Sequence, residues 1–185
     1  MLLNIITPCS RPENLHTIGN SINIPRENYR WIVVFDREEL PDSKLIPENC
    51  EVYLHRNPQS TVGHSQRNFA IDLVESGHVY MNDDDTILHP NLWENIQDLD
   101  LDLISFSQEN SDGSLRLRGD RIEPCHIDSH NFIVSRRLIG DRRWIIDKYD
   151  ADGLFAREMY YALQENPEFT GAFIPEVLST YNSLR

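Results

Sequence analysis

The sequence predicts an α/β domain in which helices flank a mostly parallel sheet. Short apolar runs alternate with helical patterns through roughly the first hundred residues, which is typical of parallel strands joined by crossover helices. The run 31–35 is continuously apolar and rich in β-branched residues, as expected of a central strand covered on both faces. Beyond residue 106 the pattern is less regular, so we expect a mixed, partly antiparallel second half.

The elements expected in the first half follow from local patterns. A compact apolar run at 2–7 predicts a buried first strand that ends at Pro8, and the next loop leads into a helix. Apolar residues at helical spacing after residue 65 predict a second helix, with Gly77 as its stop. We expect strands at 2–7, 31–35, 52–54, 78–82 and 103–106, and helices over 13–22, 65–76 and 90–99.

The second half offers fewer signals. The sequence Ser-Asp-Gly-Ser at 111–114 predicts a turn between two antiparallel strands within 109–118. Local apolar patterns predict a strand at 132–134, a helix over 151–164 and a last strand through 172–174 and 177–178.

Three consecutive carboxylates, Asp83–Asp85, directly follow the β-prone run at 78–82. Adjacent carboxylates repel one another, and a hard divalent cation with oxygen ligands is the simplest compensation. The carboxyl ends of parallel strands are also where ligands bind in open α/β sheets. A solvated acidic turn is the plain structural alternative.

Composition narrows the classes of function. The chain has 185 residues and a formal net charge of −13, which argues against binding to nucleic acid or to an anionic membrane. Its three cysteines show no metal-binding spacing, so we expect free thiols in a reducing compartment. The absence of a signal peptide and of a membrane-spanning apolar stretch predicts a cytoplasmic protein without an integral membrane segment. The sequence leaves the oligomeric state open.

Other nucleotide-binding and metal-binding patterns fit poorly. A calcium loop that begins at Asp83 would have Ile87 and Leu88 where an oxygen ligand and a glycine are needed. No GxxxxGK motif occurs, which excludes a Walker-type phosphate loop. The loop after Thr7 has no glycine, whereas sugar-phosphate nucleotidyltransferases begin with a glycine-rich loop.

Four motifs, taken in order, resemble the GT-A glycosyltransferases. They are Ile-Ile-Thr-Pro at 5–8 with Arg11-Pro12, the strand 31–34 closed by Asp36, Gln-Arg-Asn at 66–68, and Val-Tyr-Met-Asn-Asp-Asp-Asp at 79–85. The patterns are similar to glycosyltransferase family 2 and to the family 43 β-glucuronosyltransferases, and the resemblance covers about residues 2–106.

The resemblance implies a single GT-A (Rossmann-like) domain over 1–185. Its nucleotide-sugar half is 1–106 and its acceptor half 107–185. It also implies a metal-dependent enzyme that uses Mn²⁺ or Mg²⁺ and moves a sugar from a nucleotide-diphosphate donor, with a UDP-sugar favoured. The acceptor is the hydroxyl of a glycan or another molecule, and the transfer is inverting. The alternative from a different class is a non-catalytic nucleotide-sugar or glycan-binding module with the same fold.

The family's site residues carry over to matching positions. Asp85 corresponds to the metal ligand, Asp84 and Asp83 face the ribose and the metal, and Asp36 accepts from the uracil N–H. Arg67 corresponds to a basic residue beside the nucleotide, away from the acceptor side. Pro8 and Arg11 belong to the same nucleotide-binding set. Cys9 is a departure, because family 43 has a base-stacking aromatic residue at this position.

The resemblance also implies a general base at the head of a helix in the second half. Asp152 fits this role best and Asp150 is the runner-up, with the reading that one of them caps the helix. His126 and His130 are candidates for a third metal ligand or an acceptor contact, against the plainer reading of hydrogen-bonded structural histidines. We interpret Trp144 as a core or acceptor-platform residue.

Overall fold

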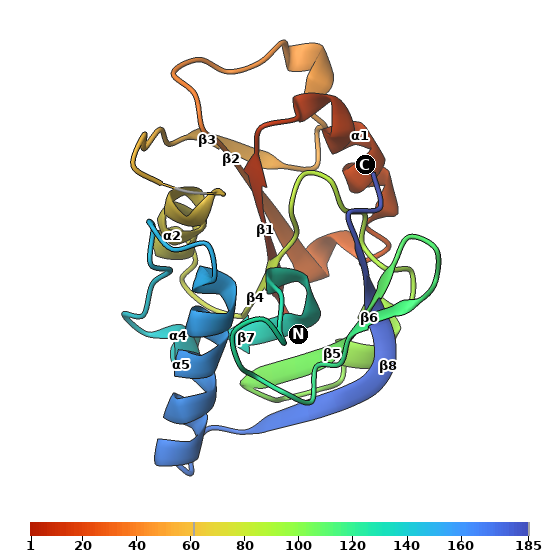
Figure 1. Ribbon diagram of the computed structural model, residues 1–185. Coiled ribbons are helices and arrows are strands. Elements are labelled where there is room, and N and C mark those ends of the chain that lie inside the picture. Colours follow the sequence, from red (N-terminus) through yellow and green to blue (C-terminus); the bar gives the residue numbers. More distant parts are fainter. Residues whose placement is uncertain (61, 185) are drawn as a thin grey trace.

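A computed structural model of the protein describes residues 1–60 and 62–184. Its strands are β1 (Leu3–Cys9), β2 (Tyr29–Phe35), β3 (Glu51–Leu54), β4 (His78–Met81), β5 (Leu103–Asn110), β6 (Leu115–Leu117), β7 (Phe132–Ser135) and β8 (Gly171–Tyr181). Within the described chain they form one eight-stranded sheet in the order β3-β2-β1-β4-β7-β5-β6, with β8 paired to β5 (Figure 1).

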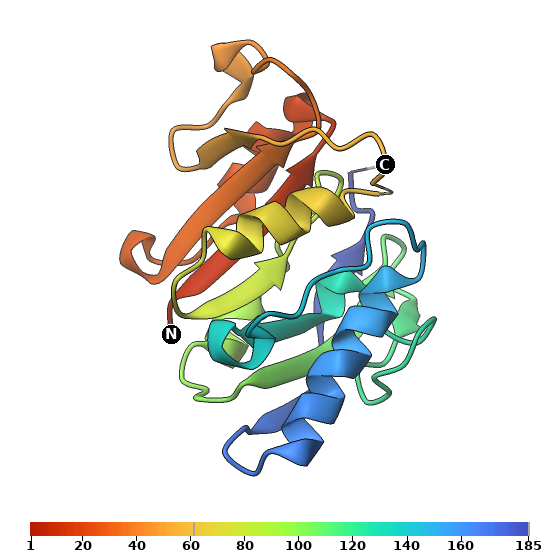
Figure 2. The same cartoon turned by 90° about the vertical axis from the view of Figure 1, so that its left-hand side faces the viewer.

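The helices lie on both faces of this sheet. They are α1 (Leu15–Ser21), α2 (His64–Asp72), α3 (Leu92–Ile96), α4 (Arg136–Ile139) and α5 (Ala151–Glu165), with 3-10 turns η1 (Pro12–Asn14), η2 (Arg26–Asn28), η3 (Ser43–Leu45) and η4 (Ser129–Asn131). Helices α2, α4 and α5 share one apolar cluster with the sheet, and α1 and α3 share the other. Figure 2 shows α2 and α5 in front of the sheet.

The direction of the strands changes between the two halves. Strand β1 pairs in parallel with β2 and β4, and β2 pairs in parallel with β3. In the second half β7 runs antiparallel to β4 and β5, β6 runs antiparallel to β5, and β8 runs parallel to β5. The prediction of a mostly parallel sheet with a mixed second half is confirmed.

Alternation of side chains along β1 explains why both faces are covered. Ile5 belongs to the cluster with α1, and its neighbour Ile6 belongs to the cluster with α2. Both side chains are completely buried, because successive residues of a strand point to opposite faces. The continuous apolar run in β2 has the same cause, since a strand buried on both faces has no polar side.

Strand β1 extends further than predicted, because Pro8 lies inside it. Asn82 donates a backbone hydrogen bond to the carbonyl of Ile6, so even-numbered residues of β1 direct their polar groups towards β4. Strand β4 pairs with β1 only as far as Ile6. The N–H that Pro8 lacks would therefore face no neighbouring strand, and a proline is tolerated there.

Helix α2 ends earlier than predicted, at Asp72, before the expected stop at Gly77. Gly77 serves another purpose: its φ is +86°, and a Cβ there would lie 2.6 Å from the carbonyl oxygen of Leu2. It therefore lets the chain turn close against β1 as β4 begins. Helix α3 is also shorter than predicted, and α4 was not predicted.

The remaining predictions of the second half agree with the structure. Strands β5 and β6 form the expected hairpin, with Gly113 in the turn at a φ of +82°. Helix α5 matches the predicted helix to within one residue at its end, and β8 joins both predicted apolar runs in one irregular strand. The three cysteines are free, as predicted. None of the helices in the described chain combines the length and the apolar character needed to cross a bilayer.

Candidate active site

Two adjoining pockets lie where the parallel strands end. The first pocket has a volume of about 330 Å³ and is lined by the segments after β1, β2 and β4 and by the start of α2. The second pocket, of about 270 Å³, is lined mainly by residues of the second half, including the first turn of α5. Val62, Asp83 and Asp85 line both pockets, so the acidic triplet stands where the two meet.

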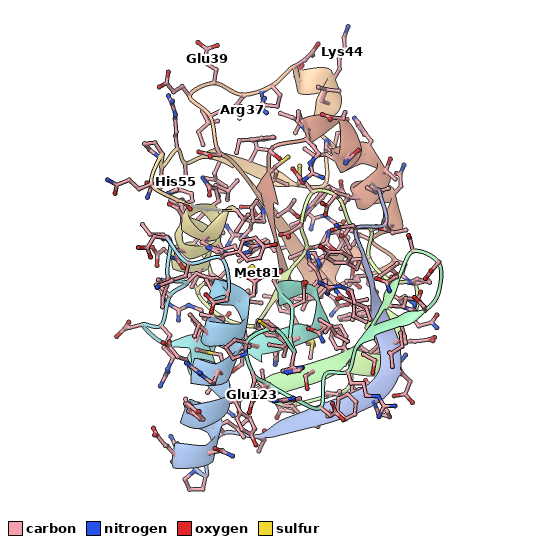
Figure 3. The ribbon with its side chains drawn as sticks, viewed as in Figure 1. Arg37, Glu39, Lys44, His55, Met81 and Glu123 are labelled. Atoms are coloured by element: carbon pink, nitrogen blue, oxygen red, sulfur yellow. The ribbon has the colours of Figure 1, made fainter. Side chains whose placement is uncertain are left out.

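The triplet follows the end of β4 and lines the first pocket. Met81, the last residue of β4, lies near the centre in Figure 3, whereas Glu39 and Lys44 project from the connection between β2 and β3 at its periphery. The chain that follows Met81 therefore enters the cleft directly, as expected for the carboxyl end of a parallel strand.

Asp84 ties two loops together. Its Oδ2 accepts hydrogen bonds from the Ser10 N–H at 2.6 Å, the Ser10 hydroxyl at 2.9 Å and the Arg11 N–H at 2.7 Å. The residue lines the first pocket but is 3% exposed. Asp84 thus fixes the loop after β1 against the loop after β4, and this oxygen has little capacity left for a ligand.

Arginines compensate the negative charge of the triplet. Arg11 donates from Nη1 to Asp85 Oδ2 at 2.9 Å, and its Nη2 lies 3.3 Å from Asp84 Oδ1. Arg67 donates to Asp83 Oδ1 at 2.6 Å. The repulsion that led us to expect a cation is therefore already reduced by two side chains of the protein itself.

Asp83 is held as a carboxylate. Burial raises its pKa, but Arg67 and His130 outweigh this effect and keep the pKa well below its ordinary value. Its side chain is 31% exposed and faces both pockets. Asp83 is therefore ionised across the whole physiological pH range.

The structure does not present His130 as a metal ligand. Its Nε2 lies 3.3 Å from Asp83 Oδ2 and 3.0 Å from the Asp83 backbone nitrogen, and its Nδ1 lies 3.3 Å from Asp128 Oδ1. Burial lowers the pKa of His130, but the carboxylates of Asp83 and Asp128 outweigh it and raise the pKa to about 9. Both ring nitrogens therefore lie next to groups of the protein itself. His126 is exposed and lines neither pocket, so the structure does not bring it to the triplet either.

Arg67 differs from its expected place. It lines the second pocket together with Asp152 and is 2% exposed, so the structure does not separate it from Asp152 as expected. A buried guanidinium needs acceptors, and Arg67 finds them in Asp83 and in the carbonyl oxygen of Val62 at 2.8 Å. These acceptors draw the side chain to the junction of the two pockets.

Asp152 stands in the first turn of α5 and faces the second pocket. Trp144 Nε1 donates to its Oδ1 at 3.0 Å, and His64 Nε2 lies 3.8 Å from the same oxygen. The pKa of Asp152 is raised, because burial outweighs the opposing effect of Arg67. Asp150 occupies the N-cap position of α5 but makes no side-chain cap hydrogen bond, and it is exposed.

The two pockets divide the predicted site residues. Pro8, Arg11, Asp36 and the triplet line the first pocket, and Asp36 is exposed directly after β2. The sequence analysis missed Arg116, Asp128 and Tyr181, which line the second pocket. Arg116 pairs with Asp128 at 3.0 Å and lies 3.6 Å from the centre of the Tyr181 ring. The histidines on either side of 127–129 were the one signal in that segment.

The donor atoms at the junction fit a hard cation that binds together with a ligand. Among the described residues, no group of three or more His, Cys, Asp or Glu side chains forms a ready-made metal centre. Asp83 and Asp85 nevertheless present carboxylates to both pockets. Magnesium-type ions are commonly held by one or two carboxylates together with substrate phosphates, so two such residues suffice.

Comparison with known proteins places the chain by its fold. No protein-family model matches the sequence, and no curated protein matches it. The structure of S. aureus TarS 1–349 is similar with a TM-score of 0.73 and 15% identity, over 97% of this chain and 60% of that one. TarS 1–349 in complex with UDP-GlcNAc gives a TM-score of 0.70 with 15% identity, over 97% and 58% of the two chains.

A mannosyltransferase is also similar. PcManGT from Pyrobaculum calidifontis, in complex with GDP-Man and Mn²⁺, matches with a TM-score of 0.66 and 12% identity, over 97% of this chain and 56% of that one. The chain thus spans just under three-fifths of the length of this neighbour and about three-fifths of TarS 1–349. These likenesses confirm the fold class predicted from the sequence, and the protein shares its α/β fold with TarS 1–349 and PcManGT.

Proposed function

We propose that the protein is a metal-dependent glycosyltransferase. It moves a sugar from a nucleotide-diphosphate donor, with a UDP-sugar favoured, to an acceptor hydroxyl with inversion. One observation carries the proposal: two pockets meet at Asp83 and Asp85, and the second contains a carboxylate, Asp152, with a raised pKa. This arrangement offers a place for a diphosphate between a nucleoside site and a base.

The first pocket serves as the donor site in this proposal. Asp36 accepts from the N–H of the base, Pro8 and Arg11 line the nucleotide, and Asp84 holds their loop in place. Complexes of similar structures with UDP, UDP-GlcNAc and GDP-Man support a nucleotide sugar as the ligand. Arg67 lies at the junction with the second pocket, so we assign it to the diphosphate–sugar side.

Asp83 and Asp85 would hold the cation, Mn²⁺ or Mg²⁺, as they are the triplet members that face both pockets. A bound divalent cation would supply positive charge that stabilises the departing diphosphate. His130 contacts Asp83 through its Nε2 and is not itself a ligand in this proposal.

Asp152 is the proposed base because of its surroundings. Of the other carboxylates that line the second pocket, Asp83, Asp85 and Asp128 each contact an arginine, and Asp150 is exposed. Asp152 instead accepts from an indole N–H, and its raised pKa favours proton transfer near neutral pH. Asp152 takes the proton of the acceptor hydroxyl, the hydroxyl oxygen bonds to the anomeric carbon, and the bond to the diphosphate breaks. Asp150 remains the runner-up.

The two pockets also agree with the proposed division of a single domain over 1–185. All residues named in the first pocket precede residue 86, and most residues of the second pocket follow residue 115. We keep 1–106 as the donor half and 107–185 as the acceptor half. The acceptor in this proposal is a glycan or another hydroxyl compound.

A calorimetric titration tests the metal dependence. We expect UDP or GDP to bind at least about tenfold more tightly with Mn²⁺ or Mg²⁺ than with EDTA, because the cation joins the diphosphate to Asp83 and Asp85. Asp85→Ala should abolish this difference. A screen of UDP- and GDP-sugars for metal-dependent hydrolysis then identifies the donor. Equal affinity with and without metal would contradict the proposal, and binding without any turnover would support the alternative of a non-catalytic binding module.

A further inference from the structure

We infer that Trp144 is a positioning residue that holds Asp152 through its indole N–H, and that Asn68 holds Trp144 in place. The inference rests on the proposed function, in which Asp152 takes the acceptor proton. It assigns a role to two side chains outside the metal and nucleotide contacts.

The indole of Trp144 has a fixed direction. Its ring stacks on Phe155 with centroids 3.5 Å apart and an interplanar angle of 16°, and the residue is 3% exposed. Rotation of a ring packed in this way would break the stack, so the N–H keeps pointing at Asp152 Oδ1, 3.0 Å away. The interpretation of Trp144 as a core residue is therefore only part of its role.

Asn68 clamps the backbone of Trp144 on both sides. Its Oδ1 accepts from the Trp144 N–H at 2.7 Å, and its Nδ2 donates to the Trp144 carbonyl at 2.8 Å. These two bonds connect α2 to a segment 76 residues later in the chain. The amide satisfies both backbone groups at once, and only an asparagine-like side chain can do so.

Neighbouring residues of α2 thus organise both sides of the cleft. Arg67 holds Asp83 at the junction of the pockets, and Asn68 holds Trp144, which holds Asp152. One helix therefore sets the position of the proposed metal-side carboxylate relative to the proposed base. Such spacing matters because a misplacement of about 1 Å can reduce a rate by 10²-fold.

The bond from Trp144 leaves one oxygen of Asp152 for chemistry. Oδ1 is occupied, and Oδ2 has no hydrogen-bond partner among the described residues. The charged groups near Asp152 are Arg67, Asp83 and Asp128. His64 is close as well, but burial first and Arg67 second lower its pKa to about 4, so it is neutral at pH 7. Trp144 is thus a neutral donor that stabilises the carboxylate and fixes its plane.

Trp144→Phe is the direct test, because it keeps an aromatic ring on Phe155 and removes the N–H. We expect turnover of the donor identified by the screen to fall about tenfold, the worth of one hydrogen bond to a charged group, with UDP affinity unchanged. Loss of the donor destabilises the carboxylate and raises the pKa of Asp152, so the acidic limb of the kcat profile moves to higher pH. Trp31→Phe is the matched control, since it also removes a buried indole bond, 3.0 Å long, to Thr7.

A second test observes Trp144 directly in the wild-type protein, with one variant as its control. The sequence has three tryptophans, which give three indole N–H signals in an NMR spectrum. We expect the Trp144 signal to move as Asp152 titrates and this movement to vanish in Asp152→Asn. A Trp144→Phe variant with unchanged turnover and pH profile, or an indole signal that ignores pH, overturns the inference. If Asp152→Asn itself keeps full turnover, the proposed function fails instead.

Discussion

The two sides of the cleft hold their side chains by different means. On the first side, Asp36 directly follows the end of β2, so the sheet itself delivers it. On the second side, Asp152 depends on Trp144, and Trp144 depends on Asn68 in another helix. The comparison teaches that a strand end places a group at the edge of the sheet without further support, whereas the proposed base, which stands on a helix, is held by distant residues. Substitutions should therefore act on binding on the first side and on turnover on the second.

The largest effect is expected from a matched pair of carboxylate substitutions. Asp152→Asn should reduce kcat by about 10²–10⁴, the typical contribution of a general base, with UDP affinity unchanged. Asp36→Asn should weaken UDP binding by about tenfold, because the charge-assisted hydrogen bond from the uracil N–H to the carboxylate becomes a neutral one. It should leave kcat almost unchanged. Steady-state kinetics and calorimetry on both variants measure the contrast.

The opposite pattern would break the comparison. If Asp36→Asn lost kcat and Asp152→Asn lost UDP affinity, the two pockets would have exchanged roles. If Asp150→Asn were inactive but folded while Asp152→Asn turned over normally, the runner-up would be the base.

Substitution of one glycine on each side of the cleft should have an effect of intermediate size. An Ala Cβ at Gly153 would overlap the backbone of Pro124, and one at Gly63 would lie 2.6 Å from Pro8 Cβ at a φ of +78°. We expect each Gly→Ala change to cost about 1–3 kcal/mol of unfolding free energy, measured by urea denaturation. Gly153→Ala should reduce kcat because it displaces Asp152, and Gly63→Ala should reduce UDP affinity because it displaces Pro8.

Gly113→Ala separates steric overlap from backbone strain. Its φ is +82°, but nothing lies within 4 Å of the Cβ position. The control should therefore cost only about 1 kcal/mol of strain and change neither binding nor turnover. Equal losses for all three variants would show that the close approaches at Pro8 and Pro124 do not matter.

The last prediction concerns His64, which belongs to α2 and whose Nε2 lies 3.8 Å from Asp152 Oδ1. The pKa of His64 is lowered to about 4 in the folded protein, first by burial and then by Arg67, whereas its ordinary value in the unfolded chain is 6.5. The unfolded state therefore binds the proton first. The contribution of neutral His64 to the unfolding free energy is fully present above pH 6.5 and is lost as the pH falls towards 4. The loss at pH 5 amounts to about 2 kcal/mol.

Urea denaturation at pH 5 and pH 7 checks this dependence. His64→Gln should show a flatter decline in unfolding free energy than the wild type. His126→Gln, at an exposed histidine, should decline like the wild type. An unchanged decline in His64→Gln would show that the acid sensitivity arises elsewhere.

The residues that could be predicted are those whose placement is local. A continuous apolar run predicted β2 and helical spacing predicted α5, both nearly with their observed bounds. The end of a predicted strand pointed to the triplet, and the GT-A resemblance pointed to Asp36. The errors have the same logic. Pro8 was read as a strand end, because the sequence does not show that β4 stops pairing at Ile6.

The sequence by itself determined the order of strands and helices and the edge at which the first pocket forms. Periodicity is a property of neighbouring residues, and parallel strands necessarily share their carboxyl edge. Only the tertiary structure decided which partners the charged groups find: Arg67 turns to Asp83, His130 lies between two carboxylates, and Trp144 holds Asp152. These contacts join residues up to 47 positions apart, and no local pattern encodes which distant donor will meet which acceptor once the helices pack on the sheet.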